Sequence, residues 1–588
     1  MNAQAKRRHV PFANKISPHF LIAIPHYYKL NFSKHKFIFF VFKLCAILAD
    51  MNYYWWQYGI IYQIYPRSFQ DSDGDGIGDI QGIIVRLDYL KWLGVKAIWL
   101  SPVYPSPMAD FGYDISDYKN IDPVYGDLTD FDELLTEVHA RDMKLIMDLV
   151  PNHTSIEHPW FKESRSSGNN PKRDWYLWYD ALPDGSPPNN WLSVLGGNAW
   201  EWDEKTGQYY YHAFLKEQPD LNWRNPEVRG AMYDIMNFWL NRGIDGFRID
   251  VLWHLIKDKQ LRDNPKNPDY EDYMPDYDQY LPVYSTDQPE VMEIIQEMRT
   301  LTDHYNERLI IGEIYLPINK LVTYYGPESN GAHLPFNFML LSLPWESERI
   351  ASAIDEYESA LPENAWPNWV VGNHDKPRII SRVGYHQARI AAMLLLSLRG
   401  TPIIYYGDEI EMTDVPIPFN EVQDPQGKNM PGKNLSRDPA RTPMQWDNGI
   451  NAGFSRQKPW LRIDDKFHRY NVALQRNDPY SMLNFYRRLI DMRQKEPSLM
   501  TGDYRPLFSN NQMIAYFRHS EGNPAFLIVL NMSHRPCYYD PERIMIKGKV
   551  EIATSPELEG KTIENPLYLG GDEGVIIRLF ENATPFGK

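Results

Sequence analysis

Polar side chains follow four apolar segments of the sequence, at the point where each segment ends. They are acids, histidines and one arginine: Asp148, His153, Arg248, Asp250, Glu313, His374 and Asp375. A single acid in such a place would indicate no more than a helix cap or a surface ion pair. Acids and imidazoles that lie close together in the folded protein can instead attack, protonate and orient a substrate. Their recurrence on successive segments indicates a catalytic site.

The apolar segments themselves are short and continuous, which is typical of strands buried on both faces of a parallel sheet. They span residues 59–65, 97–101, 144–150, 246–250, 309–314, 368–374 and 401–406, and an eighth is expected around 334–340. Helix-like segments, such as 130–143 and 227–243, alternate with them. This alternation predicts an α/β protein with a (β/α)8 TIM barrel, in which catalytic groups stand at the carboxyl ends of the strands.

Uneven spacing between the segments predicts further domains. The gap between the third and fourth strands is far longer than a simple strand–helix unit needs, and short strand-like runs take over after Asp503. We therefore expect an inserted subdomain B after strand 3 and a C-terminal antiparallel β-sandwich domain. The expected ranges are 51–152 and 223–503 for the catalytic barrel, 153–222 for subdomain B and 504–588 for the C-terminal β domain.

Residues 1–50 differ from the rest of the chain, because they are basic and end in an apolar stretch over 37–49. Lys43 interrupts this stretch, which is also shorter than the roughly 20 residues that cross a bilayer. We predict a non-globular, non-native extension, with Met51 as the start of the protein and no membrane association. A cleaved export signal is the alternative.

Charge and cysteine content restrict the partners and the compartment. The formal net charge is −16, which argues against a nucleic-acid partner, since phosphates require a basic surface. The two cysteines, Cys45 and Cys537, provide no disulfide framework, so a reducing, cytoplasmic compartment is expected unless residues 1–49 direct export. The sequence leaves open whether the protein is a monomer or a homodimer.

Several motifs, in their order and spacing, resemble the signature regions of the α-amylase superfamily, glycoside hydrolase family 13. Four of them contain the polar residues named above: DLVPNH (148–153), GFRIDVLWH (246–254), IGEIY (311–315) and VVGNHDKPR (370–378). Three further matches are GIIYQIYPRSF (59–69), QPDLNW (218–223) and GTPIIYYGDEI (400–410). The resemblance runs from about Tyr53 to the C-terminus.

This resemblance implies a role for each polar residue. Asp250 would be the nucleophile, Glu313 the general acid/base and Asp375 the transition-state stabiliser. The residues expected to bind the sugar are Tyr113, Asp114, Asp148, His153, Arg248, His374, Arg378 and Arg441. Of these, Asp114 and Arg441 match a pair that closes the non-reducing end of the site in the α-glucosidase branch. A closed end implies the removal of single glucose units.

The implied function is that of a retaining exo-α-glucosidase, which releases terminal α-D-glucose from maltose, isomaltose or sucrose-type substrates through a covalent β-glucosyl-enzyme intermediate. QPDLN and Val251 resemble members that accept α-1,6 links, so oligo-1,6-glucosidase is a close alternative. Sucrose or trehalose isomerases and transglucosylases use the same residues and also stay open. A non-catalytic transporter heavy chain shares the fold, but the complete catalytic set argues against it.

The run DSDGDGIGD (71–79) predicts a site for a hard cation, because acids that alternate with glycines can wrap an ion in oxygen ligands. The expected carboxylate ligands are Asp71, Asp73, Asp75 and Asp79, and the resemblance implies that the Ile77 carbonyl is a further ligand. The resemblance implies a structural Ca²⁺ or Mg²⁺ and no organic cofactor. An EF-hand would carry Glu where Gly82 stands, and a turn held by Asp–Gly pairs is the alternative.

Overall fold

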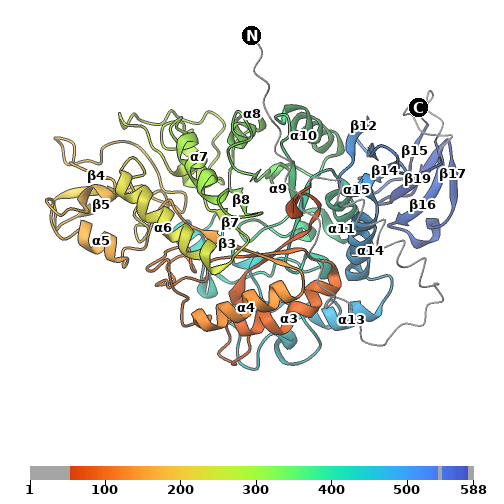
Figure 1. Ribbon diagram of the computed structural model, residues 1–588, viewed down its shortest axis with the longest axis horizontal. Helices are drawn as coiled ribbons and strands as arrows, with labels where there is room; N and C mark the ends of the chain where they lie inside the picture. The colour runs from red at the N-terminus through yellow and green to blue at the C-terminus, as the bar shows by residue number, and fades with distance from the viewer. Residues whose placement is uncertain (1–52, 541–545, 581–588) are drawn as a thin grey trace, which may run out of the picture. The chain divides into compact units, whose positions relative to one another are not determined.

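The computed structural model describes residues 53–540 and 546–580. The described residues from Tyr54 onward belong to one compact unit (Figure 1). The predicted extension, residues 1–50, lies outside the described residues. Within the part of the chain that the structure describes, no helix is long and apolar enough to cross a membrane.

Within residues 53–540, eight parallel strands form the predicted barrel sheet, in the order β10-β11-β1-β2-β3-β7-β8-β9. The strands are β1 (Ile61–Ile64), β2 (Ala97–Leu100), β3 (Lys144–Leu149), β7 (Gly246–Ile249), β8 (Leu309–Gly312), β9 (Leu334–Pro335), β10 (Asn368–Val370) and β11 (Thr401–Tyr405). The sixth apolar segment yields only the two residues of β9. Asn368 completes the circuit between β9 and β10, because its side-chain amide donates to the Pro335 carbonyl (2.6 Å) and accepts from the Asn337 backbone (3.0 Å). The predicted fold class is confirmed.

Alternate strand residues face two different cores, which explains why the segments are continuously apolar. Ile61, Trp99 and Ile146 belong to the core inside the barrel. Tyr62 and Leu145, their chain neighbours, pack outward against the surrounding helices. The main helices of this layer are α3 (Ile80–Leu93), α4 (Leu128–Ala140), α6 (Pro226–Arg242), α7 (Val291–Thr302), α10 (Ser347–Ala360), α11 (Ile379–Ser397) and α14 (Met482–Lys495).

Capping residues set the helix boundaries. Asp79 accepts from the backbone of Gly82 at the start of α3, and Asp127 forms a capping box at the start of α4. Gly94 and Gly243 end α3 and α6 with left-handed backbone, a conformation that costs glycine little. These residues fix where α3 and α4 begin and where α3 and α6 end.

The segment between β3 and β7 carries its own small sheet. It consists of β4 (Trp178–Tyr179), β6 (Gln208–Tyr211) and β5 (Trp200–Asp203), in that order and antiparallel. Trp191, Trp200 and Tyr211 form its aromatic core. A buried ion pair between Lys257 and Asp220 ties the end of this segment to the residues that follow β7.

The described C-terminal region contains a six-stranded antiparallel sheet and a two-stranded sheet that share one hydrophobic core. The larger sheet has the order β12 (Asp503–Ser509), β13 (Met513–His519), β14 (Phe526–Asn531), β19 (Gly574–Leu579), β16 (Lys547–Ala553) and β17 (Thr562–Glu564). The smaller one pairs β15 (Cys537–Tyr539) with β18 (Leu567–Leu569). Arg518 donates to the Gly502 carbonyl and also contacts the Ser397 carbonyl at the end of α11, which joins this region to the barrel.

Candidate active site

A cavity of about 400 Å³ opens where β7, β8 and β10 end. Asp250, Glu313 and Asp375 line it, and each follows one of these strands by no more than five residues. Tyr113 and His153 line it as well. The structure therefore brings the three predicted catalytic acids to one cavity at the carboxyl end of the barrel, where parallel strands converge.

Arg248 holds three carboxylates around one guanidinium. Its Nη1 lies 2.8 Å from Asp148 Oδ1 and 2.7 Å from Asp250 Oδ1, and its Nη2 lies 2.7 Å from Glu313 Oε2. Arg248 and Asp250 share a side of β7 because side chains two residues apart along a strand point the same way. Contacts through adjacent nitrogens of one guanidinium place the Asp250 and Glu313 carboxyl groups side by side, as a retaining mechanism requires.

Burial and crowding change the ionisation of these acids. Burial and the Glu313 carboxylate raise the pKa of Asp250 well above its usual value, while Arg248 opposes the shift. Burial also raises the pKa of Asp148 to about 6, again against Arg248. One positive charge cannot balance the negative charges crowded around it, so burial opposes the ionisation of Asp250 and Asp148 even though both contact Arg248.

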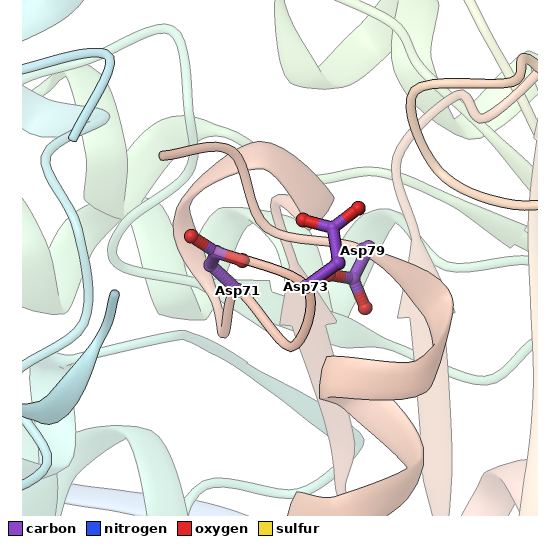
Figure 2. Close-up of side chains that lie close together, drawn as sticks. All are labelled: Asp71, Asp73 and Asp79. Atoms are coloured by element: carbon purple, nitrogen blue, oxygen red, sulfur yellow. The ribbon is translucent and has the colours of Figure 1, made fainter. Parts of the chain in front are cut away.

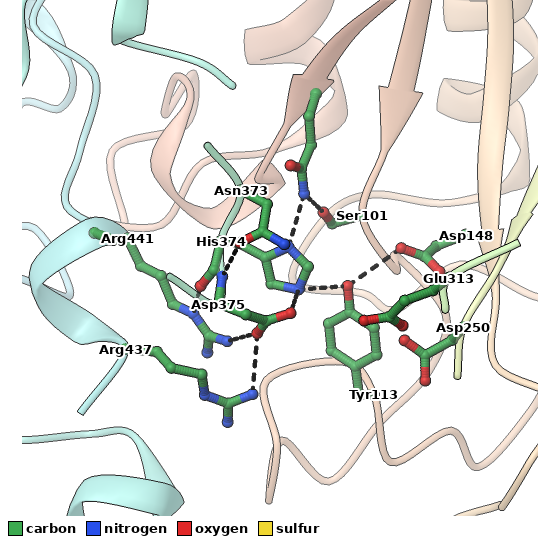
Figure 3. A network of polar contacts seen from close by, with 12 residues as sticks. Ser101, Tyr113, Asp148, Asp250, Glu313, Asn373, His374, Asp375, Arg437 and Arg441 are labelled. Carbon is green, nitrogen blue, oxygen red and sulfur yellow. Dashed lines mark hydrogen bonds and ion pairs between the residues drawn. The ribbon is translucent and has the colours of Figure 1, made fainter. Parts of the chain in front are cut away.

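His374 belongs to a chain of side chains that begins at β1 (Figure 3). The Gln63 amide lies 2.7 Å from His374 Nδ1, and His374 Nε2 lies 2.8 Å from the Tyr113 hydroxyl. The Tyr113 ring stacks on the imidazole at 5.3 Å, and its hydroxyl donates to Asp148 at 3.2 Å. Burial lowers the pKa of His374 to about 3, so the imidazole is neutral and its two nitrogens have opposite roles.

Asp375 is surrounded by positive charge. Its Oδ1 lies 3.0 Å from Arg441 Nη2 and 3.3 Å from Arg437 Nη1, and His374 Nε2 is 3.4 Å from its Oδ2 (Figure 3). Burial alone would raise the pKa of Asp375, but His374, Arg437 and Arg441 bring it below the usual range. Positive charge therefore favours the anionic form of Asp375, whereas burial and the Glu313 carboxylate oppose the ionisation of Asp250.

An ion pair closes one end of the cavity. Arg437 Nη2 lies 2.6 Å from Asp110 Oδ1 and 2.7 Å from Asp424 Oδ1. Asp110 and Arg437 both line the cavity beside Asp375. The ion pair therefore forms part of the cavity wall next to the catalytic acid Asp375.

Comparison with known proteins identifies the family. The model of the α-amylase catalytic domain matches residues 63–502. The chain belongs to the α-amylase family. A probable alpha-glucosidase of Rhizobium meliloti is 41% identical over 82% of this chain and 89% of its own length. An oligo-1,6-glucosidase of Parageobacillus thermoglucosidasius is 38% identical over 85% of this chain and 94% of its own length. The crystal structure of a trehalulose synthase from Pseudomonas mesoacidophila is similar with a TM-score of 0.83, 36% identity and coverage of 90% of this chain and 100% of that chain.

Membership of the α-amylase family confirms the resemblance seen in the sequence, but the structure revises which pair closes the pocket. Asp114 is fully buried and accepts from the Asp110 and Ala109 backbones (3.0 Å each), so it shapes the loop and does not line the cavity. Arg441 is likewise buried behind Asp375. The closing pair is Asp110 with Arg437. Each lies four residues before the predicted residue, and the sequence carries no signal that tells which member of each pair faces the cavity.

Arg378, which was expected to bind sugar, lies outside the cavity of this family member. Its guanidinium donates to the Tyr406 carbonyl at 2.7 Å and stacks on the rings of Tyr405 and Tyr406. It therefore supports the residues that follow β11. Asp148 and Arg248 are also buried beneath the cavity, and they reach it only through Tyr113, Asp250 and Glu313.

The acidic run at 71–79 forms the loop ahead of α3 (Figure 2). Carboxylate oxygens of Asp71, Asp73 and Asp79 lie within 4.8 Å of one another, a spacing and donor set that fit a hard cation. Asp75 is not part of this cluster, and its carboxylate accepts from the Ile77 backbone at 2.7 Å. The structure thus gathers three of the four predicted acids and leaves Asp75 aside.

Proposed function

We propose that this chain is a retaining exo-α-glucosidase that releases single α-D-glucose units from short α-glucosides. The observation that carries the proposal is the position of the Asp110–Arg437 ion pair, 2.6 Å between charged atoms, at the end of the cavity next to the catalytic acids. A cavity that this ion pair closes would accept a chain end and reject the middle of a polymer. The names of relatives, alpha-glucosidase and oligo-1,6-glucosidase, agree with this reading.

The first chemical step needs an ionised Asp250 and a proton on Glu313. A glycosidic oxygen beside Glu313 accepts a hydrogen bond from that residue, which localises the proton there and leaves Asp250 ionised. Asp250 attacks the anomeric carbon while Glu313 protonates the leaving oxygen, and a covalent β-glucosyl ester results. Arg248, 2.7 Å from Asp250, orients the attacking carboxylate and stabilises its charge.

The second step reverses these roles. Glu313 now takes a proton from water, and the resulting nucleophile displaces Asp250 to give glucose with the α configuration retained. Asp375, held ionised by Arg437 and Arg441, can accept hydrogen bonds from sugar hydroxyls that strengthen as positive charge develops on the ring.

Isomerisation of sucrose is the second candidate. The structural likeness to trehalulose synthase at a TM-score of 0.83 favours it, because the same glucosyl-enzyme can be attacked by a retained sugar in place of water. The two functions share every residue named above and differ only in the acceptor.

One experiment separates these functions. The purified protein is incubated with maltose, isomaltose, sucrose and trehalose, and the products are followed by proton NMR. We expect free glucose, first released as the α anomer. Formation of trehalulose or isomaltulose without free glucose would show that the protein is an isomerase and not a hydrolase. Glucose first released as the β anomer would refute the retaining mechanism.

We also propose that Asp71, Asp73 and Asp79 hold a structural Ca²⁺ or Mg²⁺, since their oxygens lie within 4.8 Å of one another. The ion would add positive charge that relieves the repulsion between these carboxylates, away from the catalytic acids. The scarcity of cysteine supports a cytoplasmic location.

A further inference from the structure

Gln63 brings an amide group into the interior of the barrel. It lies on β1 two residues after Ile61, which belongs to the core inside the barrel, so the two side chains lie on the same side of the strand. The Gln63 side chain is fully buried and does not line the catalytic cavity. Because burial of an amide costs free energy unless the amide forms hydrogen bonds, its partners indicate its role.

Two neighbours can accept hydrogen bonds from this amide. Gln63 Nε2 lies 2.7 Å from His374 Nδ1 and 3.3 Å from Ser101 Oγ, and Gln63 Oε1 has no partner among the described residues. If the amide were rotated by half a turn, its oxygen would face both neighbours and both hydrogens of its nitrogen would be unpaired. Buried donors without a partner are rarer in proteins than carbonyl oxygens without one, so we assign the nitrogen to the side of His374.

The opposite edge of the imidazole leads independently to the same assignment. His374 Nε2 lies 2.8 Å from the Tyr113 hydroxyl and 3.4 Å from Asp375 Oδ2 (Figure 3). Positive charge around Asp375 favours its anionic form, and a lone pair on His374 Nε2 would repel that anion. A proton on Nε2 attracts the anion and also leaves the Tyr113 hydroxyl free to donate to Asp148, 3.2 Å away. A neutral imidazole has one proton, so Nδ1 must then accept a hydrogen bond from Gln63.

We propose that Gln63 is a positioning residue, which holds His374 in one orientation and one tautomer, with the proton on Nε2 toward Asp375. Without the amide, the Nδ1 lone pair would be buried without a partner, so the imidazole would no longer have a fixed orientation. The Asp375 carboxylate and the Tyr113 hydroxyl would then lose the donor that orients them. Groups that stabilise a developing charge must be in place before the reaction, so we expect this loss to lower kcat more than it raises KM. The kinetic consequence rests on the proposed α-glucosidase function, whereas the position of the proton does not.

Nitrogen-15 NMR of the protein with labelled histidine locates the His374 proton without a substrate. Protonated and unprotonated ring nitrogens have well-separated chemical shifts, and the His374→Ala variant identifies the His374 signals by their absence. We expect Nε2 to carry the proton and Nδ1 to be an acceptor. A proton on Nδ1 in the unmodified protein overturns the proposal.

The variant Gln63→Glu tests the direction of the hydrogen bond, because a carboxyl group can donate only while it holds a proton. At low pH the carboxyl group and His374 Nδ1 share one proton, so Nε2 keeps its own. As the pH rises this shared proton is lost, and the carboxylate draws the remaining imidazole proton to Nδ1. We therefore expect the kcat of Gln63→Glu, divided by that of the unmodified protein, to fall about tenfold as the pH rises. A ratio that is constant or rises with pH overturns the proposal.

Other ionisable groups also lie around His374, and the ratio of the two kcat values removes their contribution. These groups titrate in both proteins, because only residue 63 differs between them. The charged groups and phenols that face the imidazole are Asp375, Arg248, Arg437, Arg441, Tyr65 and Tyr113.

The variant Gln63→Met removes both hydrogen bonds at nearly the same size and tests whether Gln63 acts through His374. We expect kcat to fall about tenfold and KM to change less than about twofold. In a protein that already carries His374→Ala, Gln63→Met should change kcat less than about twofold, because no imidazole is left to position. Equal losses of kcat in the two backgrounds would show that Gln63 does not act through His374, and they overturn the proposal.

The matched control is Gln387→Met. Gln387 is a similarly buried amide on α11 that bonds with Trp345 at 2.9 Å and Asp572 at 2.5 Å, and it does not line the cavity. Its replacement should lower the free energy of unfolding and leave kcat within about twofold of the unmodified value. A tenfold loss of kcat in this control would show that the loss of any buried amide has the same effect, and it overturns the specific role of Gln63.

This inference and the proposed function fail in different ways. If α-glucosides are hydrolysed but the proton lies on His374 Nδ1, the α-glucosidase function stands and the role of Gln63 is wrong. If the proton lies on Nε2 but no α-glucoside is hydrolysed, the proposed function itself is wrong.

Discussion

At the scale of single residues, Arg248 sets the proton balance of the site, because it lowers the pKa values of both Asp250 and Asp148 against the effect of burial. Replacing Arg248 by Gln removes that positive charge. The pKa of Asp250 should then rise further, so a higher pH is needed to ionise the nucleophile. We expect the acid limb of the pH profile of kcat/KM to move to higher pH, with about a 100-fold lower maximum.

The control for this variant is Arg242→Gln, since Arg242 pairs with Asp132 on the outer helix layer, far from the cavity. Its pH profile should match that of the unmodified protein. If Arg248→Gln unfolds at the normal temperature and its acid limb does not move, Arg248 does not control the pKa of the nucleophile.

Asp110 and Asp114 lie four residues apart and have separable tasks. Asp110→Asn weakens the ion pair with Arg437 at the end of the cavity, so we expect kcat/KM for maltose to fall about 100-fold through a raised KM. Asp114→Asn keeps one accepting oxygen but replaces the other by an NH2 group that faces a backbone N–H, and should lower the free energy of unfolding by about 2 kcal/mol. Steady-state kinetics and denaturant unfolding of both variants check this division, which fails if Asp114→Asn shows the KM effect without the loss of stability.

At the scale of elements, two loops meet beside the cavity. Lys433, in the segment after β11, binds the segment after β7 through Asp276 (2.6 Å), the Met274 carbonyl (2.7 Å) and the Tyr270 hydroxyl (3.2 Å). The Lys433 ammonium group thus donates to three acceptors on both sides of Pro275 in the sequence, and these bonds fix the position of Pro275 in the cavity wall. Lys433→Ala should free this segment, so we expect KM to rise about tenfold while kcat changes less than twofold.

Lys428→Ala is the matched control, because Lys428 is exposed on the short helix α12 (Pro425–Asn429) of the same segment. It removes an equal charge without touching the segment after β7. If both variants raise KM equally, the effect comes from net charge and the proposed link between the loops is wrong.

The difference between strands and loops explains how much of the fold and the site could be predicted from the sequence. Continuous apolar runs predicted the barrel strands because both faces of such strands are buried, and the polar residue after each run located Asp250, Glu313 and Asp375. The long segments after β7 and β11 have no such pattern of apolar residues. The closing residues Asp110 and Arg437 lie on irregular loops, where only the fold decides which of two acids or arginines faces the cavity. The sequence also did not reveal that β9 has only two residues and is bridged to β10 by the Asn368 side chain.

At the scale of the whole molecule, the loop at 71–79 connects distant parts of the chain. The Asp71 backbone donates to the Phe454 carbonyl, and the Gly76 carbonyl accepts from the Trp460 backbone, both at 3.0 Å. Residues near the start of the barrel are thereby fastened to the segment after its last strand. An ion that stabilises this loop should therefore raise the stability of the entire folded unit, with no direct effect on catalysis.

Thermal unfolding measured with and without Ca²⁺ tests this expected stabilisation. Ligands that bind only the folded state stabilise it by about 2.7 kcal/mol at 100 times their Kd, so Ca²⁺ should raise Tm after EDTA treatment. Asp73→Asn should abolish this rise, because Asp73 belongs to the carboxylate cluster. Asp75→Asn is the matched control, since Asp75 lies in the same loop outside the cluster, and it should keep the rise. A Tm that is insensitive to both Ca²⁺ and Mg²⁺ would leave the loop as a turn held by its own backbone hydrogen bonds.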